Sequence, residues 1–378
     1  MMVDKRKFKD INVSLLGLGT MRLPCETEQK RESNPNIDYD KAQSLVDLAY
    51  KNGVNYFDTA YMYHCGKSEA FIGYALKKYP RDTYFIADKL PIWLCDTKED
   101  MKRVFDEQLE RTGMDYFDFY LLHSLDNENF EKCEKFDAYD FLKKMQKEGK
   151  IKYIGFSFHG TVDDLRNIVS AHKWDFAQIQ MNYLDWENQN AKTQYQILEN
   201  ADIPTIVMEP VRGGKLALVN DEISDMFKLL KPDNSPASWA MGFVASHKNI
   251  ITILSGMNSS EQMLDNLSAL TDFKPFTDVE YSLCEKAAAI INKSEVISCT
   301  GCDYCQPCPK GIKISSFFSL YNSVVSGEID INSGRDKYNS YKVNPTACAW
   351  CNKCKNHCPQ SISVPDVLEG KVVKLFMQ

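Results

Sequence analysis

Residues 84–122 read YFIADKLPIWLCDTKEDMKRVFDEQLERTGMDYFDFYLL and contain two short β-rich runs with a helical pattern between them. The runs Tyr84-Phe85-Ile86-Ala87 and Phe117-Asp118-Phe119-Tyr120-Leu121-Leu122 predict buried strands, and the apolar spacing from Lys98 to Thr112 predicts a helix. A strand, a helix and a second strand at this spacing form a right-handed crossover between parallel neighbours. The stretch therefore predicts one βαβ unit of a parallel sheet.

The same unit recurs over residues 40–270. Further strands are predicted at residues 54–57, 151–155, 176–180, 204–208 and 250–254, and further helices at residues 39–52 and 137–148. Seven such strands, with an eighth that the pattern does not place, favour a closed (β/α)8 TIM barrel over an open sheet. Residues 10–23, with two glycines and no helical period, predict an N-terminal hairpin.

Length and composition limit the classes of protein. The chain has 378 residues, of which 44% are hydrophobic and 26% charged, as in globular proteins with two or three domains. Its net charge of −7 is spread along the sequence, whereas a nucleic-acid partner requires concentrated positive charge. No apolar run approaches the roughly 20 residues of a membrane span, and the charged N-terminus lacks the apolar core of a signal peptide. We therefore expect a cytoplasmic protein with no membrane or nucleic-acid partner.

Eight of the 13 cysteines lie in two runs after residue 298, where the strand–helix alternation has ended. We expect a barrel domain over residues 1–292 and a second domain over residues 293–378. The five scattered cysteines are best explained as small buried hydrophobes or idle thiols. In a reducing compartment, the tight runs argue for metal rather than disulfides. The runs are Cys299, Cys302, Cys305 and Cys308 and, 49 or 50 residues later, Cys348, Cys351, Cys354 and Cys358.

The second run has the spacing Cys-x2-Cys-x2-Cys-x3-Cys-Pro of bacterial ferredoxins. In two-cluster ferredoxins the fourth cysteine of each run ligates the other cluster, so the repeat predicts a ferredoxin-like domain with two [4Fe–4S] clusters. The first run departs from the pattern because only two residues separate Cys305 from Cys308. Structural zinc sites, or a single cluster, remain the alternatives. By the ferredoxin rule the two ligand sets are Cys299, Cys302, Cys305 and Cys358, and Cys348, Cys351, Cys354 and Cys308.

Four polar residues follow successive predicted strands, where parallel barrels place their active sites. Asp58 and Tyr63 follow the strand over residues 54–57. Lys89 follows the strand over residues 84–87, and His123 follows the strand over residues 117–122. Each alone has an ordinary explanation, such as a helix cap for Asp58 or a surface position for Lys89. Four at successive strand ends predict a catalytic group.

The sequences around these four residues resemble the catalytic tetrad of the aldo-keto reductase superfamily: Phe57-Asp58-Thr59-Ala60-x2-Tyr63, Asp88-Lys89-Leu90-Pro91 and Leu121-Leu122-His123. The resemblance covers roughly residues 10–290, and its nearest sub-pattern is the bacterial subgroup with a C-terminal ferredoxin-type 4Fe–4S extension. It implies an NAD(P)H-dependent enzyme that transfers hydride reversibly between the nicotinamide and a small carbonyl or alcohol substrate. Tyr63 would be the general acid, and Lys89 would lower its pKa by stabilising the phenolate. Asp58 would hold Lys89, and His123 would orient the substrate oxygen.

The same resemblance implies a dinucleotide site along the strand ends. Ser157 and Gln180 would grip the nicotinamide carboxamide, and Thr20 and Met21 would lie beneath the ring. Met208 stands where many members stack an aromatic side chain, and a thioether packs on the ring without that stacking. Two further segments complete the expected contacts: Pro210, Val211, Arg212, Gly213, Gly214 and Lys215 at the pyrophosphate, and Gly256, Asn258, Gln262, Asp265 and Asn266 at the adenosine.

The choice between NADH and NADPH depends on cations near the adenosine ribose. Many family members place an arginine or lysine near the position of Asn258 to pair with the 2′-phosphate of NADP, and this chain has none there. The sequence therefore favours NADH. The alternative is that Arg212 or Lys215 reaches the phosphate.

Three functions are compatible with the two modules. The first is a hydride oxidoreductase whose clusters are structural, sense redox state or exchange electrons with a partner protein. The second is a nucleotide-sensing regulatory or binding module, and the third is an electron-transfer protein whose clusters are the main redox centres. The intact tetrad favours the first. Neither the substrate nor the oligomeric state follows from the sequence.

Overall fold

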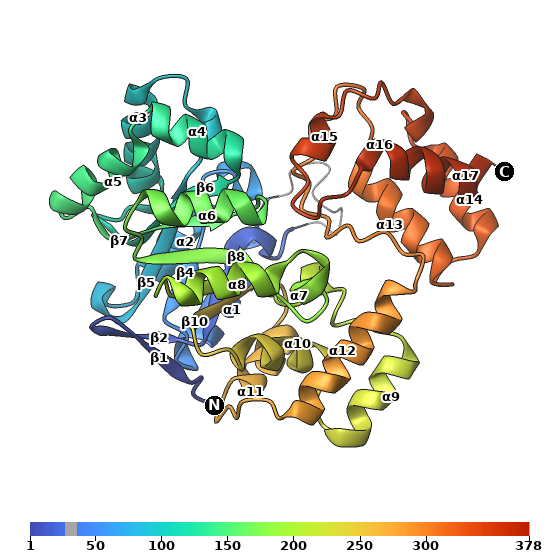
Figure 1. Cartoon of the computed structure of the whole chain (residues 1–378), viewed down its shortest axis with the longest axis horizontal. Coiled ribbons are helices and arrows are strands. Elements are labelled where there is room, and N and C mark those ends of the chain that lie inside the picture. The colour runs from blue at the N-terminus through green and yellow to red at the C-terminus, as the bar shows by residue number, and fades with distance from the viewer. Residues whose placement is uncertain (27–35, 378) are drawn as a thin grey trace. The chain divides into compact units, whose positions relative to one another are not determined.

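A closed barrel of eight parallel strands forms the larger part of the molecule (Figure 1). The computed structural model describes residues 1–26 and 36–377. Neighbouring strands follow the order β10-β3-β4-β5-β6-β7-β8-β9, and β9 pairs with β10 to close the ring. The (β/α)8 barrel predicted from the sequence is confirmed. The barrel strands are β3 (Leu16–Gly19), β4 (Tyr56–Asp58), β5 (Phe85–Leu90), β6 (Phe117–Leu125), β7 (Ile151–Phe158), β8 (Phe176–Gln180), β9 (Thr205–Met208) and β10 (Ile250–Ser255).

The eighth strand is β3, which lies in the segment predicted as a hairpin. The hairpin is formed earlier in the chain by β1 (Lys5–Phe8) and β2 (Ile11–Ser14), which pair antiparallel, so the prediction of a hairpin over residues 10–23 is wrong in its extent. β3 contains Gly17 and Gly19, which weaken the strand pattern in the sequence. Close packing requires glycine at position 17. A Cβ on Gly17 would lie 2.8 Å from the side chain of Leu254 in β10. Glycine is depleted in strands, so this close approach removes the usual strand signal.

Helices follow the strands and cover the outside of the barrel (Figure 1). Reciprocal capping boxes begin two of these helices, with Thr97 and Asp100 at α3 and Thr161 and Asp164 at α6. No helix among the described residues is both long and apolar enough to cross a membrane. The helices up to residue 292 are α1 (Tyr39–Lys51), α2 (Ser68–Leu76), α3 (Lys98–Thr112), α4 (Asn127–Lys135), α5 (Ala138–Lys147), α6 (Val162–Ala171), α7 (Asp185–Asn188), α8 (Ala191–Asn200), α9 (Asp221–Leu230), α10 (Pro236–Ala245), α11 (Ser260–Ala269) and α12 (Asp278–Asn292).

Apolar side chains fill the end of the barrel where the strands begin. Phe8 and Val13 from the hairpin join Tyr56, Phe119 and Phe176 in one buried cluster. The ring centroids of Phe8 and Phe119 are 5.4 Å apart. Burying one such side chain stabilises the fold by about 1.5–3 kcal/mol. The polar residues of the barrel interior gather at the opposite end, where the strands finish.

The chain divides into two compact units. The first comprises Met1–Val211 and Leu216–Ala287, and the second comprises Arg212–Lys215 and Ala288–Gln378. The division falls within α12, slightly before residue 293, where the character of the sequence changes. The segment Arg212–Lys215, which follows β9, belongs to the second unit although its chain neighbours belong to the first.

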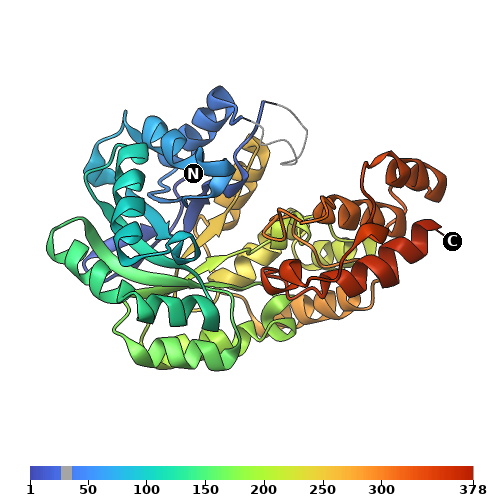
Figure 2. The same ribbon diagram turned by 90° about the horizontal axis from the view of Figure 1, so that it is seen from above.

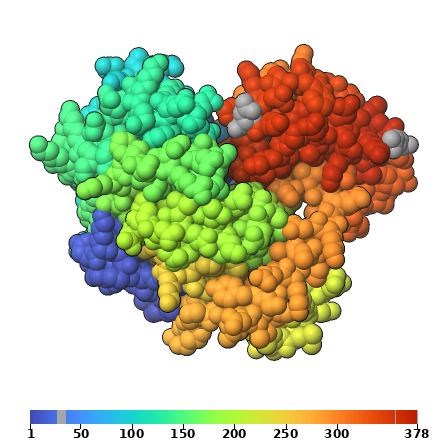
Figure 3. All heavy atoms as spheres, viewed as in Figure 1, coloured from blue at the N-terminus to red at the C-terminus, as the bar shows by residue number. Residues whose placement is uncertain are grey.

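The second unit is built from helices and loops, with no strand among its described residues 288–377. Its apolar core includes Phe317, Tyr338 and Phe376, and the rings of Tyr338 and Phe376 stack at 5.1 Å. The last helix, α17, packs beside α14. Figure 2 shows the ribbon of this unit in orange and red from above, and Figure 3 shows one face of its atoms. The helices of this unit are α13 (Ile314–Val325), α14 (Ile331–Ser340), α15 (Lys353–Asn356), α16 (Val364–Val367) and α17 (Lys374–Met377), with a π-helical turn over Leu368–Val373.

Candidate active site

Three adjacent strands bring the four predicted catalytic residues together. Asp58 is the last residue of β4, Lys89 lies near the end of β5, and His123 lies near the end of β6. Tyr63 opens a short 3-10 turn over Tyr63–Gly66 that follows β4. Because β4, β5 and β6 are consecutive in the barrel, their ends form one polar corner.

Lys89 is the centre of this corner. Its Nζ donates to Asp58 Oδ1 at 2.7 Å and to the Thr59 carbonyl at 2.6 Å, and it lies 3.5 Å from the Tyr63 hydroxyl. The side chains of Lys89 and Asp58 are almost completely buried. Burial raises the pKa of Asp58, and the Lys89 ammonium opposes that rise. An ammonium at this distance from a phenol stabilises the phenolate that is left when the phenol gives up its proton.

The imidazole of His123 also lies beside the Tyr63 ring. The ring centroids of His123 and Tyr63 are 6.3 Å apart. Burial lowers the pKa of His123 well below its usual value, and the charges of Lys89 and His159 lower it further. The imidazole is therefore neutral at neutral pH and has one N–H to donate. Its Nδ1 is buried and finds no hydrogen-bond partner among the described residues.

Two residues near His123 were missed in the sequence. Trp93, in the turn that follows β5, has its ring centroid 5.0 Å from that of His123 and is 36% exposed. His159 follows β7, and burial lowers its pKa to about 4. A signal was present for each residue, because Trp93 comes shortly after Lys89 and His159 comes shortly after Ser157. Neither alone distinguishes a site residue from an ordinary loop residue.

A chain of hydroxyl groups fixes the floor of the corner. Thr20 donates to the Asp58 carbonyl at 2.9 Å and accepts from Ser68 at 2.6 Å. Ser68 lies 2.9 Å from the hydroxyl of Thr59. Thr20 therefore ties the end of β3 to the end of β4, and Met21 follows it, half-buried. Ser68 was not singled out in the sequence, because it lies on a helix rather than at a strand end.

The residues expected at the nicotinamide lie at the ends of the next strands. The Ser157 hydroxyl accepts from the backbone N–H of Ser124 at 2.7 Å, and Gln180 donates to Asp185 at 2.7 Å. Met208, at the end of β9, accepts from Gln178 at 3.5 Å. A hydroxyl and an amide at adjacent strand ends suit a carboxamide, which both donates and accepts hydrogen bonds. The donor set therefore fits a nicotinamide.

Several residues expected at the adenosine are engaged within the barrel unit. Gln262 accepts from the backbone N–H of Asn258 at 3.0 Å, and Asn258 is exposed. Asp265 accepts from Ser235 at 2.6 Å, and Asn266 donates to Ser255 at 2.9 Å. These bonds hold the loop before α11 and the helix itself in place.

Arg22 is a cation next to this segment and was not expected there from the sequence. A Cβ on Gly256 would lie 3.1 Å from the Arg22 side chain, and Arg22 pairs with Glu209 at 3.1 Å. No local pattern predicts this contact, because residues 22 and 256 are neighbours only when β3 and β10 pair.

The segment expected at the pyrophosphate divides between the two units. Pro210 and Val211 belong to the first unit, and Arg212, Gly213, Gly214 and Lys215 belong to the second. The Arg212 guanidinium donates to Gln360 Oε1 at 3.2 and 3.3 Å. Lys215 donates to the Ile297 carbonyl, and a Cβ on Gly213 would lie 2.9 Å from Thr300. These cations therefore contact residues that flank Cys299 and Cys358.

The thiols of the first predicted ligand set are close enough to influence one another electrostatically. Burial raises the pKa of Cys305, and the nearby thiols Cys302, Cys299 and Cys358 raise it further. Lys215 lowers the pKa of Cys299, whose net rise is caused by burial. The four cysteines thus lie near one another although Cys358 is distant in sequence.

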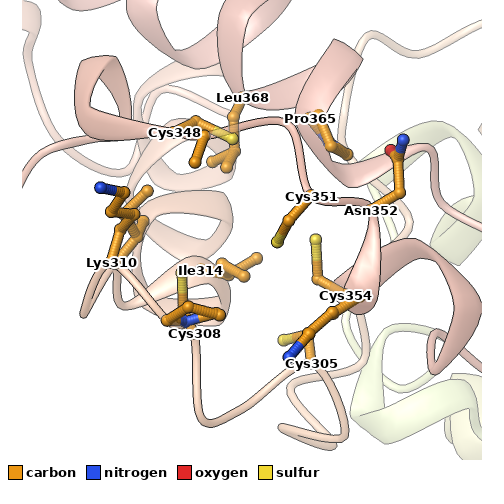
Figure 4. Close-up of a pocket in the computed structure, with 14 residues that line it drawn as sticks. Cys305, Cys308, Lys310, Ile314, Cys348, Cys351, Asn352, Cys354, Pro365 and Leu368 are labelled. Atoms are coloured by element: carbon orange, nitrogen blue, oxygen red, sulfur yellow. The ribbon is translucent and has the colours of Figure 1, made fainter.

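The second set surrounds a hollow in the same unit (Figure 4). It is lined by Cys308, Cys348, Cys351 and Cys354, and Cys305 also borders it. The sulfur atoms of Cys308, Cys351 and Cys354 point into this space. Within residues 1–26 and 36–377, however, no three His, Cys, Asp or Glu side chains have the geometry of a metal site.

The two cysteine runs repeat in backbone conformation as well as in sequence. The N–H of Gly301 donates to Cys299 Sγ at 3.3 Å, and the equivalent N–H of Trp350 donates to Cys348 Sγ at 3.5 Å. Gly301 has a φ of 66° and Trp350 a φ of 52°, both in the left-handed region. Left-handed residues that turn N–H groups toward an anion form the concave nests seen at many Fe–S sites. Two further pairs of equivalent residues also share positive φ: Asp303 with Asn352, and Gly311 with Ser361.

Comparisons with known proteins agree with the barrel. A model of the Aldo/keto reductase family matches residues 15–289. An NADH-specific methylglyoxal reductase of Escherichia coli is 25% identical over 309 residues, which are 69% of this chain and 91% of that protein. A glyoxal reductase of Bacillus subtilis is 34% identical over 120 residues, 31% of this chain and 40% of that protein. The holo form of an aldo-keto reductase from Bacillus halodurans superposes with a TM-score of 0.60 at 24% identity, over 75% of this chain and 96% of that one.

Proposed function

The chain belongs to the aldo/keto reductase family and is an NAD(P)H-dependent oxidoreductase, and we propose that it reduces small carbonyl compounds with Tyr63 as the proton donor. The observation that carries this proposal is the buried Lys89 ammonium, which is paired with Asp58 and lies 3.5 Å from the Tyr63 hydroxyl. A phenol has an ordinary pKa of about 10, too high for efficient proton transfer near neutral pH. The nearby ammonium favours the phenolate and so lowers the free energy needed for Tyr63 to give up its proton.

Each residue of the corner has a distinct part in the proposed reaction. A bound nicotinamide supplies the hydride. Tyr63 gives its proton to the carbonyl oxygen as the hydride reaches the carbon, and Lys89 stabilises the phenolate that remains. Asp58 fixes Lys89 and compensates its charge in the buried corner. His123, neutral because burial lowers its pKa, donates a hydrogen bond to the substrate oxygen and orients it.

The proposed cofactor site follows the strand ends around the barrel. Ser157 and Gln180 would hold the carboxamide, with Thr20, Met21 and Met208 around the ring. Pro210 and Val211 would extend the site toward the pyrophosphate, and Gly256, Asn258, Gln262, Asp265 and Asn266 would hold the adenosine. Residues 255–266 contain no lysine or arginine, which supports NADH over NADPH. Arg22 lies next to Gly256 and would be the cation to test for pairing with a 2′-phosphate.

We also propose that the second unit is a ferredoxin-like domain with two [4Fe–4S] clusters, which supply one-electron chemistry when bound. The duplicated left-handed residues and the equivalent N–H···S bonds at Cys299 and Cys348 support it. The proposed ligand sets remain Cys299, Cys302, Cys305 and Cys358, and Cys308, Cys348, Cys351 and Cys354. The domain would exchange electrons with a partner protein or stabilise the fold.

The reductase proposal is tested by NADH and NADPH oxidation with a panel of small carbonyls. Methylglyoxal and glyoxal come first, because two relatives are named as reductases of these compounds. We expect oxidation with at least one carbonyl and a higher kcat/KM with NADH. No oxidation with any carbonyl, together with no reduction of NAD by the matching alcohols, would contradict the proposal. A preference for NADPH would contradict the choice of cofactor alone.

The cluster proposal is tested separately on anaerobically purified protein. We expect iron and acid-labile sulfide in equal amounts, and an electron paramagnetic resonance signal after reduction. Zinc in place of iron would show structural zinc sites, and iron for a single cluster would remove one of the two ligand sets. Bleaching of the clusters by NADH without any carbonyl would instead favour electron transfer as the main function.

A further inference from the structure

A buried polar network lies behind Lys89, between the barrel wall and the helices outside it. Its members are Glu69 on α2, Asp88 on β5 and Gln108 on α3, and all three side chains are inaccessible to solvent. The Gln108 amide nitrogen donates to Glu69 Oε1 at 3.1 Å and to Asp88 Oδ1 at 2.9 Å. One nitrogen therefore bridges the two carboxyl groups. The Tyr120 hydroxyl donates to the side-chain amide oxygen of Gln108, Oε1, and completes the network.

This network holds the backbone of Lys89 at both of its polar groups. The N–H of Lys89 donates to Asp88 Oδ1 at 2.8 Å. The carbonyl of Lys89 lies 3.0 Å from the same Gln108 amide nitrogen, whose two hydrogens are shared among the three acceptors. Side chains that bind both backbone groups of a residue fix its peptide units, and with them the direction of its side chain. The position of the Lys89 ammonium beside Tyr63 thus depends on Asp88 and Gln108.

The charges in this region do not balance if every carboxyl group is ionised. Lys89 is matched by Asp58, and Arg111 is matched by Glu69, whose Oε2 accepts from it at 2.9 Å. Asp88 has no cation of its own, and its Oδ2 is buried without a hydrogen-bond donor among the described residues.

Among the described residues, the remaining groups that face the network supply no further unmatched positive charge. Glu107, on the same helix as Gln108 and Arg111, is partly exposed and is matched by Arg103 at 2.9 Å. Tyr61 donates to Glu107 at 2.7 Å, and Tyr120 is a neutral phenol. Cys95 is a buried thiol whose pKa burial raises to about 11. One carboxyl group in the cluster is therefore in excess.

We propose that Asp88 carries a proton on Oδ2 and shares it with Glu69, and that this neutral carboxyl group is a positioning residue for Lys89. The protonated oxygen donates to Glu69, while Oδ1 continues to accept from the backbone of Lys89 and from Gln108. The second half of the proposal, that Lys89 is thereby placed for proton transfer by Tyr63, rests on the proposed function.

The direction of the carboxyl pKa shifts agrees with this geometry. Burial raises the pKa of Asp88 well above its usual value, and the charge of Glu69 raises it further. Burial also raises the pKa of Glu69, but Arg111 and Gln108 oppose that rise. The proton therefore belongs mainly to Asp88.

The test compares three variants with the wild-type protein. Asp88→Asn reproduces the protonated state, because its amide nitrogen can donate to Glu69 while its oxygen accepts from Lys89. Asp88→Leu removes every bond at similar volume. Asp118→Leu is the matched control, since Asp118 is an equally buried carboxylate that accepts from the β5 backbone N–H of Ile86 at 3.0 Å, away from the candidate site.

We expect Asp88→Leu to lower kcat by about one to two orders of magnitude with little change in KM, because the ammonium loses its position. The alkaline limb of its pH–rate profile should move to higher pH, because a displaced ammonium no longer lowers the pKa of Tyr63. Asp88→Asn should keep the wild-type kcat and the wild-type pH–rate profile. Asp118→Leu should lower the free energy of unfolding but keep the wild-type kcat and pH–rate profile. If Asp88→Leu keeps the wild-type kcat and pH profile, the positioning role is wrong.

The proton itself is detected without catalysis. An infrared difference spectrum of the wild-type protein minus Asp88→Asn, at neutral pH, should contain the carbonyl stretch of a protonated carboxylic acid. If only carboxylate bands appear, the shared proton is refuted. Hydrogen exchange at the Lys89 amide should be faster in Asp88→Leu than in the wild-type protein and unchanged in Asp88→Asn. If the exchange rate is equal in the two variants, Asp88 does not hold the Lys89 backbone. These two measurements hold even if no carbonyl is reduced, so failure of the proposed function is distinguished from failure of this inference.

Discussion

Replacing Lys89 with methionine would leave the Asp58 carboxylate buried without its cation. Asp58 is almost fully buried, and its second oxygen, Oδ2, finds no donor among the described residues. Removing one partner of such a pair typically costs about 3–5 kcal/mol. The cost has an upper limit, because Asp58 can take up a proton instead. At about pH 7.5, protonating a carboxyl group with an ordinary pKa of about 3.9 costs roughly 5 kcal/mol. We therefore expect Lys89→Met to lose about 3–5 kcal/mol of stability at that pH.

The sign of the pH dependence follows from the direction of the Asp58 shift. Burial raises the pKa of Asp58 in the folded state above that in the unfolded chain, and loss of Lys89 raises it further. The folded variant therefore keeps a proton over a pH range in which the unfolded chain has released it. Its stability is highest below the unfolded-state pKa and falls as the pH rises through this range. At about pH 5 the loss should shrink to roughly 1.5 kcal/mol.

Urea unfolding followed by tryptophan fluorescence measures this loss. Four of the five tryptophans precede residue 288, so the signal reports mainly on the barrel unit. The control is Lys89→Met combined with Asp58→Asn, which leaves no buried charge and should lose only about 1 kcal/mol for the missing bond to Thr59. The reasoning is refuted if the double variant is as unstable as the single one, or if the single variant loses the same free energy at both pH values.

Three further outcomes are expected. Tyr63→Phe should lower kcat by about two to four orders of magnitude while leaving the dissociation constant of NADH, measured by fluorescence quenching, unchanged; weaker NADH binding would give Tyr63 a binding role instead. Since burial keeps His123 neutral, kcat/KM should be flat around pH 6.5, where a free histidine titrates; an inflection there that His123→Gln removes would contradict this. Cys358→Ala should lose roughly half of the iron and sulfide, whereas Cys284→Ala, a buried thiol outside the repeat, should keep all of it; equal metal content in both would exclude Cys358 as a ligand.

The sequence predicted the barrel and its polar corner because both depend on local signals. An apolar run of about four to eight residues predicts a buried strand. In a parallel barrel all strands end at the same rim, so polar residues that follow the strands are expected to be neighbours. The strand β3 was not predicted. Close packing against Leu254 requires glycine at position 17, and glycine is uncommon in strands, so the apolar pattern is weak there.

What the sequence could not predict depends on pairings between distant segments. Glu69 and Asp88 are ordinary acidic residues in the sequence, and only the packing of α2 and α3 against the barrel wall makes them one buried cluster. Arg212 and Lys215 were expected at the pyrophosphate because of their glycine-rich context. Their contacts with Gln360 and Ile297 follow from the three-dimensional arrangement of the second unit, which no local pattern encodes.

The membership of residues 212–215 in the second unit constrains how this protein can be cut or recombined. The polypeptide passes between the units three times, after residues 211, 215 and 287, so the second unit is not a simple appendage that a stop codon or a gene fusion adds or removes. A chain shortened to the first 287 residues would keep Arg212 and Lys215 but lose the groups that they bind. Any transfer of residues 288–378 to another barrel would therefore have to carry residues 212–215 with it, because Arg212 and Lys215 bind Gln360 and Ile297.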